Sequence, residues 1–191
     1  DPDKKVDMVV DEWGIWTDSE PGTNPGFLRQ QNTIRDAILA ALNFHMFHER
    51  ADRVSMTNIA QIINVLQAMV LTDKEKMLLT PTYHAFAMYK PFQNATSIPV
   101  KLASPDYTFE GESIPAVSAT AARGTDGKVR IALVNVLPGE SASIQCSVAG
   151  MKVKSTSGAI LTAPAMDAHN TFAAPDNVKP ASFKDATIQG D

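Results

Sequence analysis

The stretch Val6-Asp7-Met8-Val9-Val10-Asp11-Glu12-Trp13-Gly14-Ile15-Trp16, near the amino end, decides the fold. Its apolar, β-branched run over residues 6–10 predicts one buried strand that ends at two acids. A barrel strand presents a catalytic carboxylate in this way. Neighbouring side chains of a strand face opposite sides, so we expect one of Asp11 and Glu12 to enter a cavity and the other to support it. The alternative is that the acids only begin a solvated loop.

Two tryptophans follow the acids. Trp13 and Trp16 are separated by Gly14 and Ile15, and two indoles beside an acid make a costly exposed surface unless a flat ring covers them. Sugar rings cover indoles well. The pattern therefore favours a sugar-binding site over a solvated loop.

Further along the chain, the pattern predicts a parallel strand pair. Residues 17–26 are rich in turn residues and predict a long loop over a barrel mouth, with Asn24 and Pro25 starting a helix. Apolar residues at helical spacing predict a mostly buried helix from Ile34 to Phe47. A second strand is expected over residues 54–59. Strand, helix and strand within about 50 residues form the βαβ unit of a parallel sheet.

Three amides, Asn58, Gln61 and Asn64, are expected just past this second strand. If the strands run parallel, the amides lie at the same edge as Glu12, because parallel strands end on one side of a sheet. Neutral donors at that edge can bind sugar hydroxyls. The alternative is that each amide only caps backbone groups in an irregular loop.

His45, His48 and Glu49 share the predicted helix and suggest a metal site, since histidines three residues apart can converge on one ion. Their order does not match the His-Glu-x-x-His pattern of zinc hydrolases. A buried histidine that bonds to a backbone carbonyl is the commoner case, and we expect no metal here.

Composition excludes several classes of function. The 191 residues carry a net charge of −4 with scattered basic residues, which predicts no nucleic-acid partner and no anionic membrane surface. No apolar stretch approaches the roughly 20 residues that cross a bilayer. The single cysteine, Cys146, cannot form an internal disulfide, and we expect it to pack as a small apolar residue.

The pattern changes near Pro91. Residues 81–90 predict a helix that begins with Pro81 and is stopped by Pro91. Beyond Ile98, short β-prone runs separated by turns predict an antiparallel sandwich or jelly roll. Thr125-Asp126-Gly127 is a hairpin signal between two of these runs. The runs span residues 101–103, 114–122, 129–136, 142–148, 152–155 and 159–161.

With these pieces in place, the chain resembles the carboxyl-terminal part of family 51 glycoside hydrolases, the α-L-arabinofuranosidases. The resemblance runs along nearly the whole sequence. It is carried by residues 10–16, Ala51-Asp52-Arg53-Val54, Ile59-Ala60-Gln61-Ile62-Ile63-Asn64-Val65, His169-Asn170-Thr171-Phe172 and Ala174-Pro175. Several separated motifs in the right order are specific, whereas any one alone is weak.

The resemblance implies roles for three residues. The acid of the Asp-Glu-Trp motif, Glu12, matches the nucleophile of a retaining hydrolysis at the end of the seventh barrel strand. Gln61 matches a glutamine that contacts the arabinofuranose ring, and Trp16 matches an aromatic residue beside the sugar. Gly14 stands where relatives often have asparagine, so preference for the leaving group is expected to differ. The mechanism needs a second carboxylate about 5 to 5.5 Å from the nucleophile. Its Asn-Glu motif is absent from this sequence and is expected upstream.

The resemblance also implies a fold of the α/β plus all-β class. Residues 1–95 match the last two βα units of a (β/α)8 TIM barrel, and residues 96–191 match an antiparallel, jelly-roll-like β-sandwich short of its closing strand. The expected partners are the missing amino-terminal barrel segment and further copies in a homo-oligomer of the full-length enzyme. This chain alone is expected to be incomplete and inactive. In isolation, the apolar faces of the 6–10 strand and the 34–47 helix are expected to be uncovered, whereas the sandwich is expected to fold independently.

The function implied is that of a retaining exo-α-L-arabinofuranosidase acting on arabinose-containing hemicellulose or pectin, with no cofactor. One alternative is an endo-β-glucanase or xylanase on the same scaffold. Another is a non-catalytic carbohydrate-binding or structural β-domain. The sequence does not fix the compartment, because enzymes that act on plant polysaccharides occur on both sides of a bacterial membrane. A periplasmic or secreted location is our expectation.

Overall fold

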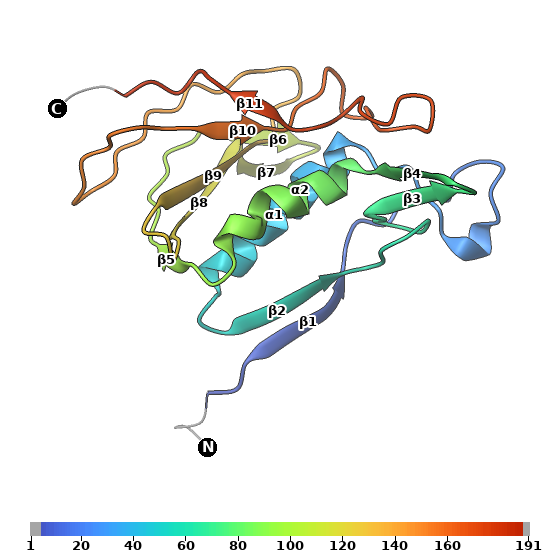
Figure 1. The fold of residues 1–191 in the computed structure, drawn as a ribbon, viewed down its shortest axis with the longest axis horizontal. Helices are drawn as coiled ribbons and strands as arrows, with labels where there is room; N and C mark the ends of the chain where they lie inside the picture. The colour runs from blue at the N-terminus through green and yellow to red at the C-terminus, as the bar shows by residue number, and fades with distance from the viewer. Residues whose placement is uncertain (1–4, 189–191) are drawn as a thin grey trace.

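The computed structural model describes residues 5–188 (Figure 1). Helices α1 (Ile34–Glu49) and α2 (Pro81–Tyr89) lie side by side in the middle of the molecule. The strand pair β1–β2 lies on one side of the helices, and the antiparallel strands of the second half of the chain lie on the other. The helices therefore lie between the parallel strand pair and the antiparallel strands.

The first strand pair is parallel, as the sequence predicts. Strand β1 (Met8–Trp13) pairs with β2 (Val54–Ile59), in a register that joins Met8 to Val54 and Trp13 to Ile59. Helix α1 forms the connection between them, which gives the expected βαβ unit.

The predicted end of the first strand is wrong. Strand β1 does not stop before the acids at residue 10 but runs through Asp11 and Glu12 to Trp13. Its register with β2 shifts between Val10 and Trp13, at the two acids. A local irregularity of this kind lets polar residues stay in a strand while the pairing continues on both sides.

Helix α1 begins at a polar cap. The carboxylate of Asp36 accepts hydrogen bonds from the backbone N–H of Thr33 at 2.7 Å and from its hydroxyl at 2.9 Å. These bonds satisfy donors that the first turn of a helix otherwise leaves unpaired. The predicted helix is confirmed over its whole length and continues to Glu49, and its buried residues include Ile34, Ala37, Ala40 and Phe44.

An aromatic cluster joins β1 to both helices. The ring of Phe44 lies 5.7 Å from Trp13, 4.7 Å from Phe86 and 4.8 Å from Tyr89. The Trp13 ring also lies 5.5 Å from the Phe47 ring. Edge-to-face pairs of this kind add to the free energy gained by burying the rings.

Between β2 and α2 the chain forms a hairpin that sequence reasoning did not predict. Strands β3 (Val70–Asp73) and β4 (Lys76–Leu79) are antiparallel. The predicted helix α2 follows, with Thr80 as its cap: the Thr80 hydroxyl accepts from the Tyr83 N–H. A short 3-10 helix, η2 (Lys90–Phe92), contains Pro91 and ends this region.

The second half of the described chain contains antiparallel strands, which agrees with the predicted all-β character. One sheet has the order β5-β8-β9, and β6–β7 and β10–β11 form separate pairs. The predicted hairpin at Asp126-Gly127 is confirmed, because it joins β8 to β9. The bounds are β5 (Thr96–Ile98), β6 (Asp106–Phe109), β7 (Glu112–Pro115), β8 (Val117–Arg123), β9 (Val129–Asn135), β10 (Gly158–Ile160) and β11 (Ala181–Phe183).

Three predicted strands are absent. Residues 101–103, 142–148 and 152–155 have no strand pairing in the structure, although their composition is β-prone. A strand needs a neighbour for its backbone hydrogen bonds, and composition does not report whether one is in reach. Cys146 lies in this irregular region and is exposed, so its predicted burial is wrong.

Both halves of the chain contribute buried residues around α1, contrary to the expectation that this helix is left uncovered. Val178, from the carboxyl-terminal segment, is fully buried with Ile34, Ala37 and Phe44 of α1. Ala41 packs against Val134 and Val136 at the end of β9. The buried side chain of Asn170 donates to the carbonyls of Leu79 and Val178. Covering α1 therefore requires residues from both halves.

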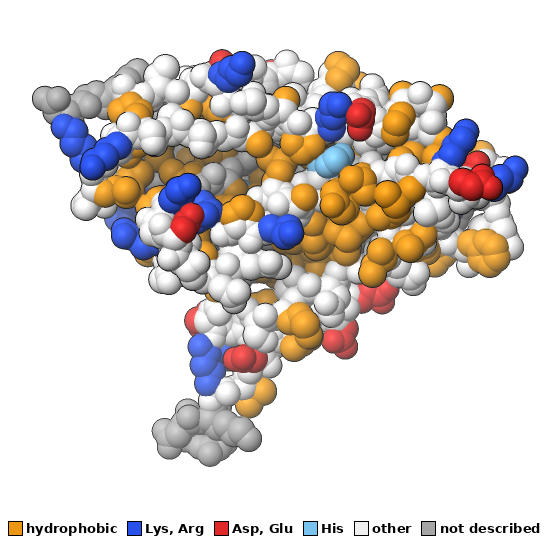
Figure 2. Space-filling view, in the orientation of Figure 1, with side chains coloured by type: hydrophobic (Ala, Val, Ile, Leu, Met, Phe, Trp, Pro, Cys, Tyr) orange, Lys and Arg blue, Asp and Glu red, His pale blue; other side chains and the backbone are white. Residues whose placement is uncertain are grey.

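The expectation for the strand faces is confirmed. Val6, Met8 and Val9 are 62%, 49% and 43% exposed. Figure 2 shows further hydrophobic side chains gathered on the visible face near α2 and the β3–β4 hairpin. Within residues 5–188, no helix combines the length and the apolar character needed to span a membrane.

Candidate active site

Glu12 and Gln61 lie at the same edge of the parallel strand pair. Glu12 is the penultimate residue of β1, and Gln61 follows the last residue of β2 by two positions. The backbone N–H of Ala60 donates to the carbonyl of Trp13 at 3.0 Å, which aligns the two strand ends. Both side chains are exposed. The structure therefore brings together the two residues that the sequence places at one edge.

The packing of Trp13 indicates which way Glu12 faces. Trp13 is directed toward α1 and α2, where it contacts Phe44, Phe47 and Phe86. The preceding side chain of a strand faces the opposite side. Alternation would place Glu12 on the face away from the helices, and its exposed side chain agrees with that side. Asp11 is also exposed, and the shift in register at this point weakens strict alternation.

The two tryptophans have different roles. Trp13 is partly buried in the aromatic cluster, so the expectation that a ligand covers both indoles is wrong for this residue. Trp16 is 68% exposed, in the loop that follows β1. Trp16 is therefore the tryptophan that is available to a sugar ring.

The loop around Trp16 is held by two buried glutamines that sequence reasoning did not identify as functional. The Gln30 side chain bonds to both neighbours of Trp16, and the Gln67 side chain bonds to one of them. A signal was present in the sequence, because Gln67 is a single amide between the apolar residues Leu66 and Ala68. The amide nitrogen of Gln67 has two acceptors, whereas its oxygen is buried without a hydrogen-bond partner among the described residues.

Gly14 is required where it stands. A Cβ atom at this position would lie 2.5 Å from Cγ of Gln67, a distance at which one of the two must move. No larger side chain fits unless Gln67 is displaced. This close approach gives a physical reason for the glycine at a position where the resemblance suggests asparagine.

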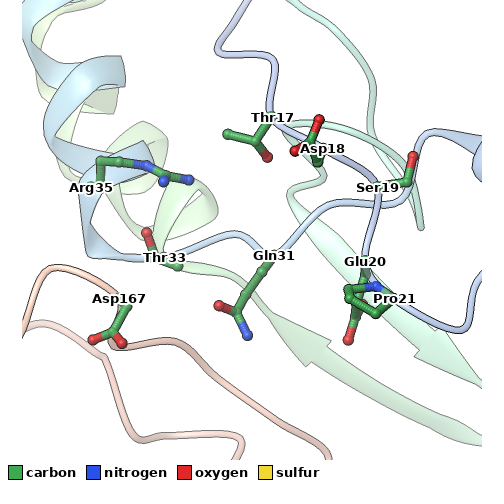
Figure 3. Close-up of a pocket in the computed structure, with 9 residues that line it drawn as sticks. All are labelled: Thr17, Asp18, Ser19, Glu20, Pro21, Gln31, Thr33, Arg35 and Asp167. Carbon is green, nitrogen blue, oxygen red and sulfur yellow. The ribbon is translucent and has the colours of Figure 1, made fainter.

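A polar hollow of about 320 Å³ lies beside the same loop (Figure 3). One wall is the loop that was predicted to cover a barrel mouth, and the opposite wall includes the first turn of α1. The guanidinium of Arg35 bonds to Asp36 at 3.2 Å. Farther along the loop, the predicted helix start at Asn24 is a short 3-10 helix, η1 (Pro25–Phe27). The lining residues are Thr17, Asp18, Ser19, Glu20, Pro21, Gln31, Thr33, Arg35 and Asp167.

The other two amides do not join the candidate site in the same way. Asn64 is partly buried, and its side chain bonds at 2.8 Å to both the hydroxyl and the backbone N–H of Thr72. This is the capping role given above as the alternative. Asn58 lies inside β2, not past its end, so its predicted position is wrong.

His45 and His48 have structural partners. The ring nitrogens of His45, which is 2% exposed, lie 2.8 Å from the Ser118 hydroxyl and 2.6 Å from the Tyr89 hydroxyl. His48 Nδ1 lies 3.3 Å from the Thr120 hydroxyl. Among residues 5–188, no three His, Cys, Asp or Glu side chains are grouped closely enough to hold a metal ion. The partners of His45 are hydroxyl groups and not the backbone carbonyl that we expected.

Burial also sets the electrostatics of this histidine pair. Burial and, to a smaller extent, the neighbouring His48 together lower the pKa of His45 to about 4. Burial likewise lowers the pKa of His48 and raises that of Tyr89. These groups are thus uncharged near neutral pH, as expected for a packed seam between α1, α2 and β8.

The chain is similar to solved structures and to curated proteins that are arabinofuranosidases. A crystal structure of a family 51 arabinofuranosidase from Xanthomonas axonopodis pv. citri is 53% identical, with a TM-score of 0.96 over 100% of this chain and 38% of that one. The Thermotoga maritima α-L-arabinofuranosidase in complex with arabinose is 25% identical, with a TM-score of 0.79 over 94% of this chain and 39% of that one.

An intracellular exo-α-L-arabinofuranosidase from Bacteroides ovatus is 47% identical over 98% of this chain and 37% of its own length. The chain thus spans well under half of the length of the relatives it matches. The family model described as the α-L-arabinofuranosidase C-terminal domain matches residues 11–191. This match begins at the two acids of β1 and includes Trp16, Gln61 and all of the antiparallel strands. The chain belongs to the α-L-arabinofuranosidase C-terminal domain family.

Proposed function

We propose that this chain is the nucleophile-bearing part of an exo-α-L-arabinofuranosidase. The enzyme removes terminal α-L-arabinofuranosyl residues from arabinose-containing hemicellulose or pectin. The observation that carries this proposal is the position of Glu12, an exposed carboxylate at the carboxyl edge of a parallel strand pair. The exo-acting relative from Bacteroides ovatus supports the choice of substrate class.

The fold that goes with this function is a barrel of which the described residues form only a part. Residues 1–95 supply the last two βα units of a (β/α)8 barrel, and residues 96–191 form a β-sandwich domain. The exposed apolar side chains of Val6, Met8 and Val9 support a barrel in which further strands continue the sheet beside β1. The amino-terminal segment of the barrel is then the first partner of this chain, and full-length copies form a homo-oligomer.

The chemistry proceeds with retention of configuration. A carboxylate oxygen of Glu12 attacks the anomeric carbon, and the bond from that carbon to the leaving oxygen breaks. A second carboxyl group, outside this chain, gives its proton to the leaving oxygen. Water then attacks the anomeric carbon and gives a proton back to the second carboxylate as the bond to Glu12 breaks.

Two more residues hold the sugar during these steps. Gln61, exposed at the same strand edge as Glu12, donates to or accepts from hydroxyl groups of the arabinofuranose ring. Trp16 offers an exposed indole face to a sugar ring. These contacts require no metal or cofactor.

The proposal is tested with Glu12→Ala in the full-length protein. With an aryl arabinofuranoside as substrate, we expect kcat to fall by more than about a hundredfold, because no other group can form the covalent intermediate. Added azide restores turnover by occupying the space of the lost carboxylate, and the product is an arabinosyl azide of inverted configuration. Asp11→Asn is the matched control, since it removes the neighbouring charge and leaves Glu12 in place. A smaller loss for Glu12→Ala would contradict the proposal.

A comparison of substrates separates this activity from endo-acting ones on the same scaffold. The full-length protein is expected to hydrolyse aryl arabinofuranoside and short arabino-oligosaccharides rapidly, and long β-glucan or xylan backbones hardly at all. Faster release of oligosaccharides from a long β-linked backbone would refute the exo-acting assignment.

A further inference from the structure

Buried side chains hold the backbone on both sides of Trp16. The carbonyl of Ile15 accepts hydrogen bonds from Gln30 Nε2 at 3.0 Å and from Gln67 Nε2 at 3.3 Å. The backbone N–H of Thr17 donates to Gln30 Oε1 at 2.9 Å. Gln30 and Gln67 are 2% and 0% exposed, whereas Trp16 between their bonds is 68% exposed. Trp16 is thus an exposed residue whose backbone neighbours are held by hydrogen bonds to buried side chains.

The orientation of both amides follows from their partners. Gln67 Nε2 lies between two groups that only accept, the Ile15 carbonyl and the Asp36 carboxylate, the latter at 2.9 Å. Gln30 presents its oxygen to an N–H group and its nitrogen to a carbonyl. A flipped amide would place donor against donor or acceptor against acceptor, so each glutamine has one working orientation.

The network extends from the loop into the core. Asp36, which receives the Gln67 bond, is fully buried and also binds Thr33 at the start of α1. On the loop side, the backbone at Gly14 packs directly against Gln67 Cγ. The loop is therefore held by the contact between Gly14 and Gln67. It is also held by hydrogen bonds that connect it through Gln67 to Asp36 in the first turn of α1.

An exposed indole on a fixed backbone is unfavourable for the free protein. Leaving the Trp16 ring in water forfeits the free energy that burial would provide, and burying Gln30 and Gln67 removes two polar side chains from water. Holding a binding group in place before the ligand arrives reduces the ordering cost of binding. The arrangement is thus one that favours a ligand and not the stability of the chain.

We propose that Gln30 and Gln67 are positioning residues that fix Trp16 as a platform for a sugar ring of the arabinose-containing substrate. This inference rests on the proposed function, and it adds two residues that never touch the sugar. Gln67 acts from the segment after β2 and Gln30 from the segment before α1, so two separate parts of the chain fix one loop. Gln30 holds both neighbours of Trp16, and Gln67 connects the loop to Asp36.

A double-mutant cycle tests the inference in the full-length protein. The variants are Trp16→Ala, Gln67→Met and the pair together, with kcat and KM measured on an arabino-oligosaccharide. Methionine keeps the length of Gln67 and its contact with Gly14 but cannot donate to Ile15 or Asp36. We expect each single variant to lower kcat/KM about tenfold, mainly through a higher KM. We expect the pair to lose less than about twofold beyond Trp16→Ala alone, because the glutamine acts through the indole.

Two further variants control the experiment. Ser118→Ala removes a hydrogen bond to buried His45, far along the chain from the loop, and should leave KM within about twofold of the wild type. If Gln67→Met is not soluble, Gln30→Met takes its place, since it breaks both bonds that Gln30 makes beside Trp16. Gln30→Met should show the same lack of additivity with Trp16→Ala.

The outcomes distinguish the inference from the proposed function. The inference fails if the losses from Trp16→Ala and Gln67→Met multiply, or if either single variant leaves kcat/KM within about twofold of the wild type. In those cases Glu12→Ala, measured in parallel, is still inactive and the proposed function stands. If Glu12→Ala keeps its activity, the proposed function itself fails.

Discussion

Acidification is expected to weaken the seam between α1, α2 and β8 through His45. This ring is 2% exposed and lies between the hydroxyl groups of Ser118 and Tyr89. Among the described residues, the titratable group that lowers its pKa, after burial itself, is His48. No carboxylate among the described partners of the ring compensates a positive charge there.

The sign of the effect follows from the two pKa values of His45. Burial, together with the neighbouring His48, lowers the pKa from 6.5 to about 4 in the folded chain, so the unfolded chain binds the proton more tightly. The stabilising contribution is therefore fully present above pH 6.5 and is lost as the pH falls toward 4. The shift corresponds to about 3 kcal/mol at its limit, and to about 2 kcal/mol of lost stability between pH 7 and pH 5.

The assay compares the pH dependence of stability in three proteins. Urea unfolding of the full-length protein is followed from pH 7 to pH 5 for the wild type, His45→Gln and Ser118→Ala. Glutamine keeps one donor and one acceptor but does not titrate, so the fall in stability should be about 2 kcal/mol smaller than in the wild type. Ser118→Ala should be less stable at every pH and keep the wild-type slope. An unchanged slope in His45→Gln would refute the reasoning.

Two further predictions concern the core. Asp36→Asn should destabilise the chain by about 3 kcal/mol, because the amide nitrogen must face either the Gln67 amide or the Thr33 donors, and the charged acceptor at the start of α1 is lost. Faster hydrogen exchange in the first turn of α1 measures this loss, and wild-type protection there would contradict it. Phe44→Ala should cost about 4 kcal/mol, since this 9% exposed ring contacts Trp13, Phe86 and Tyr89. A melting temperature within a degree of the wild type would show that the cluster does not stabilise the fold.

Local patterns predicted those helices, strands and hairpins whose sequence signal lies within one continuous segment. The helix at residues 34–47 and the strand at 54–59 were predictable because their apolar spacing or alternation is complete within a single segment. The Asp126-Gly127 hairpin was predictable because its two strands are adjacent in the sequence. The strands expected at 101–103, 142–148 and 152–155 failed because pairing depends on a neighbour that is distant in the sequence. The β3–β4 hairpin was missed for lack of an equally strong turn signal.

The residues of the candidate site also fall into two groups: those that a short motif predicts and those whose role depends on contacts with distant segments. Glu12, Trp16 and Gln61 could be proposed from the sequence because each belongs to a short motif, and the structure places Glu12 and Gln61 at one edge of the strand pair. Trp13 was misjudged because the sequence does not reveal that α1 and α2 supply three aromatic rings to cover it. Gln30 and Gln67 were not identified as functional because their importance depends on contacts across 13 to 52 residues of chain.

By itself, the sequence determined which functional groups the candidate site contains. These are the carboxylate of Glu12 and the indole of Trp16 near the end of the first strand, and the amide of Gln61 after the second strand. Local spacing also determined that this strand, a helix and a second strand form one unit. Only the tertiary structure decided that Trp13 is core and Trp16 is surface, and that residues near both ends of the chain cover α1. The physical reason is that burial and hydrogen bonding depend on which segments, distant in the sequence, lie next to each other in the fold.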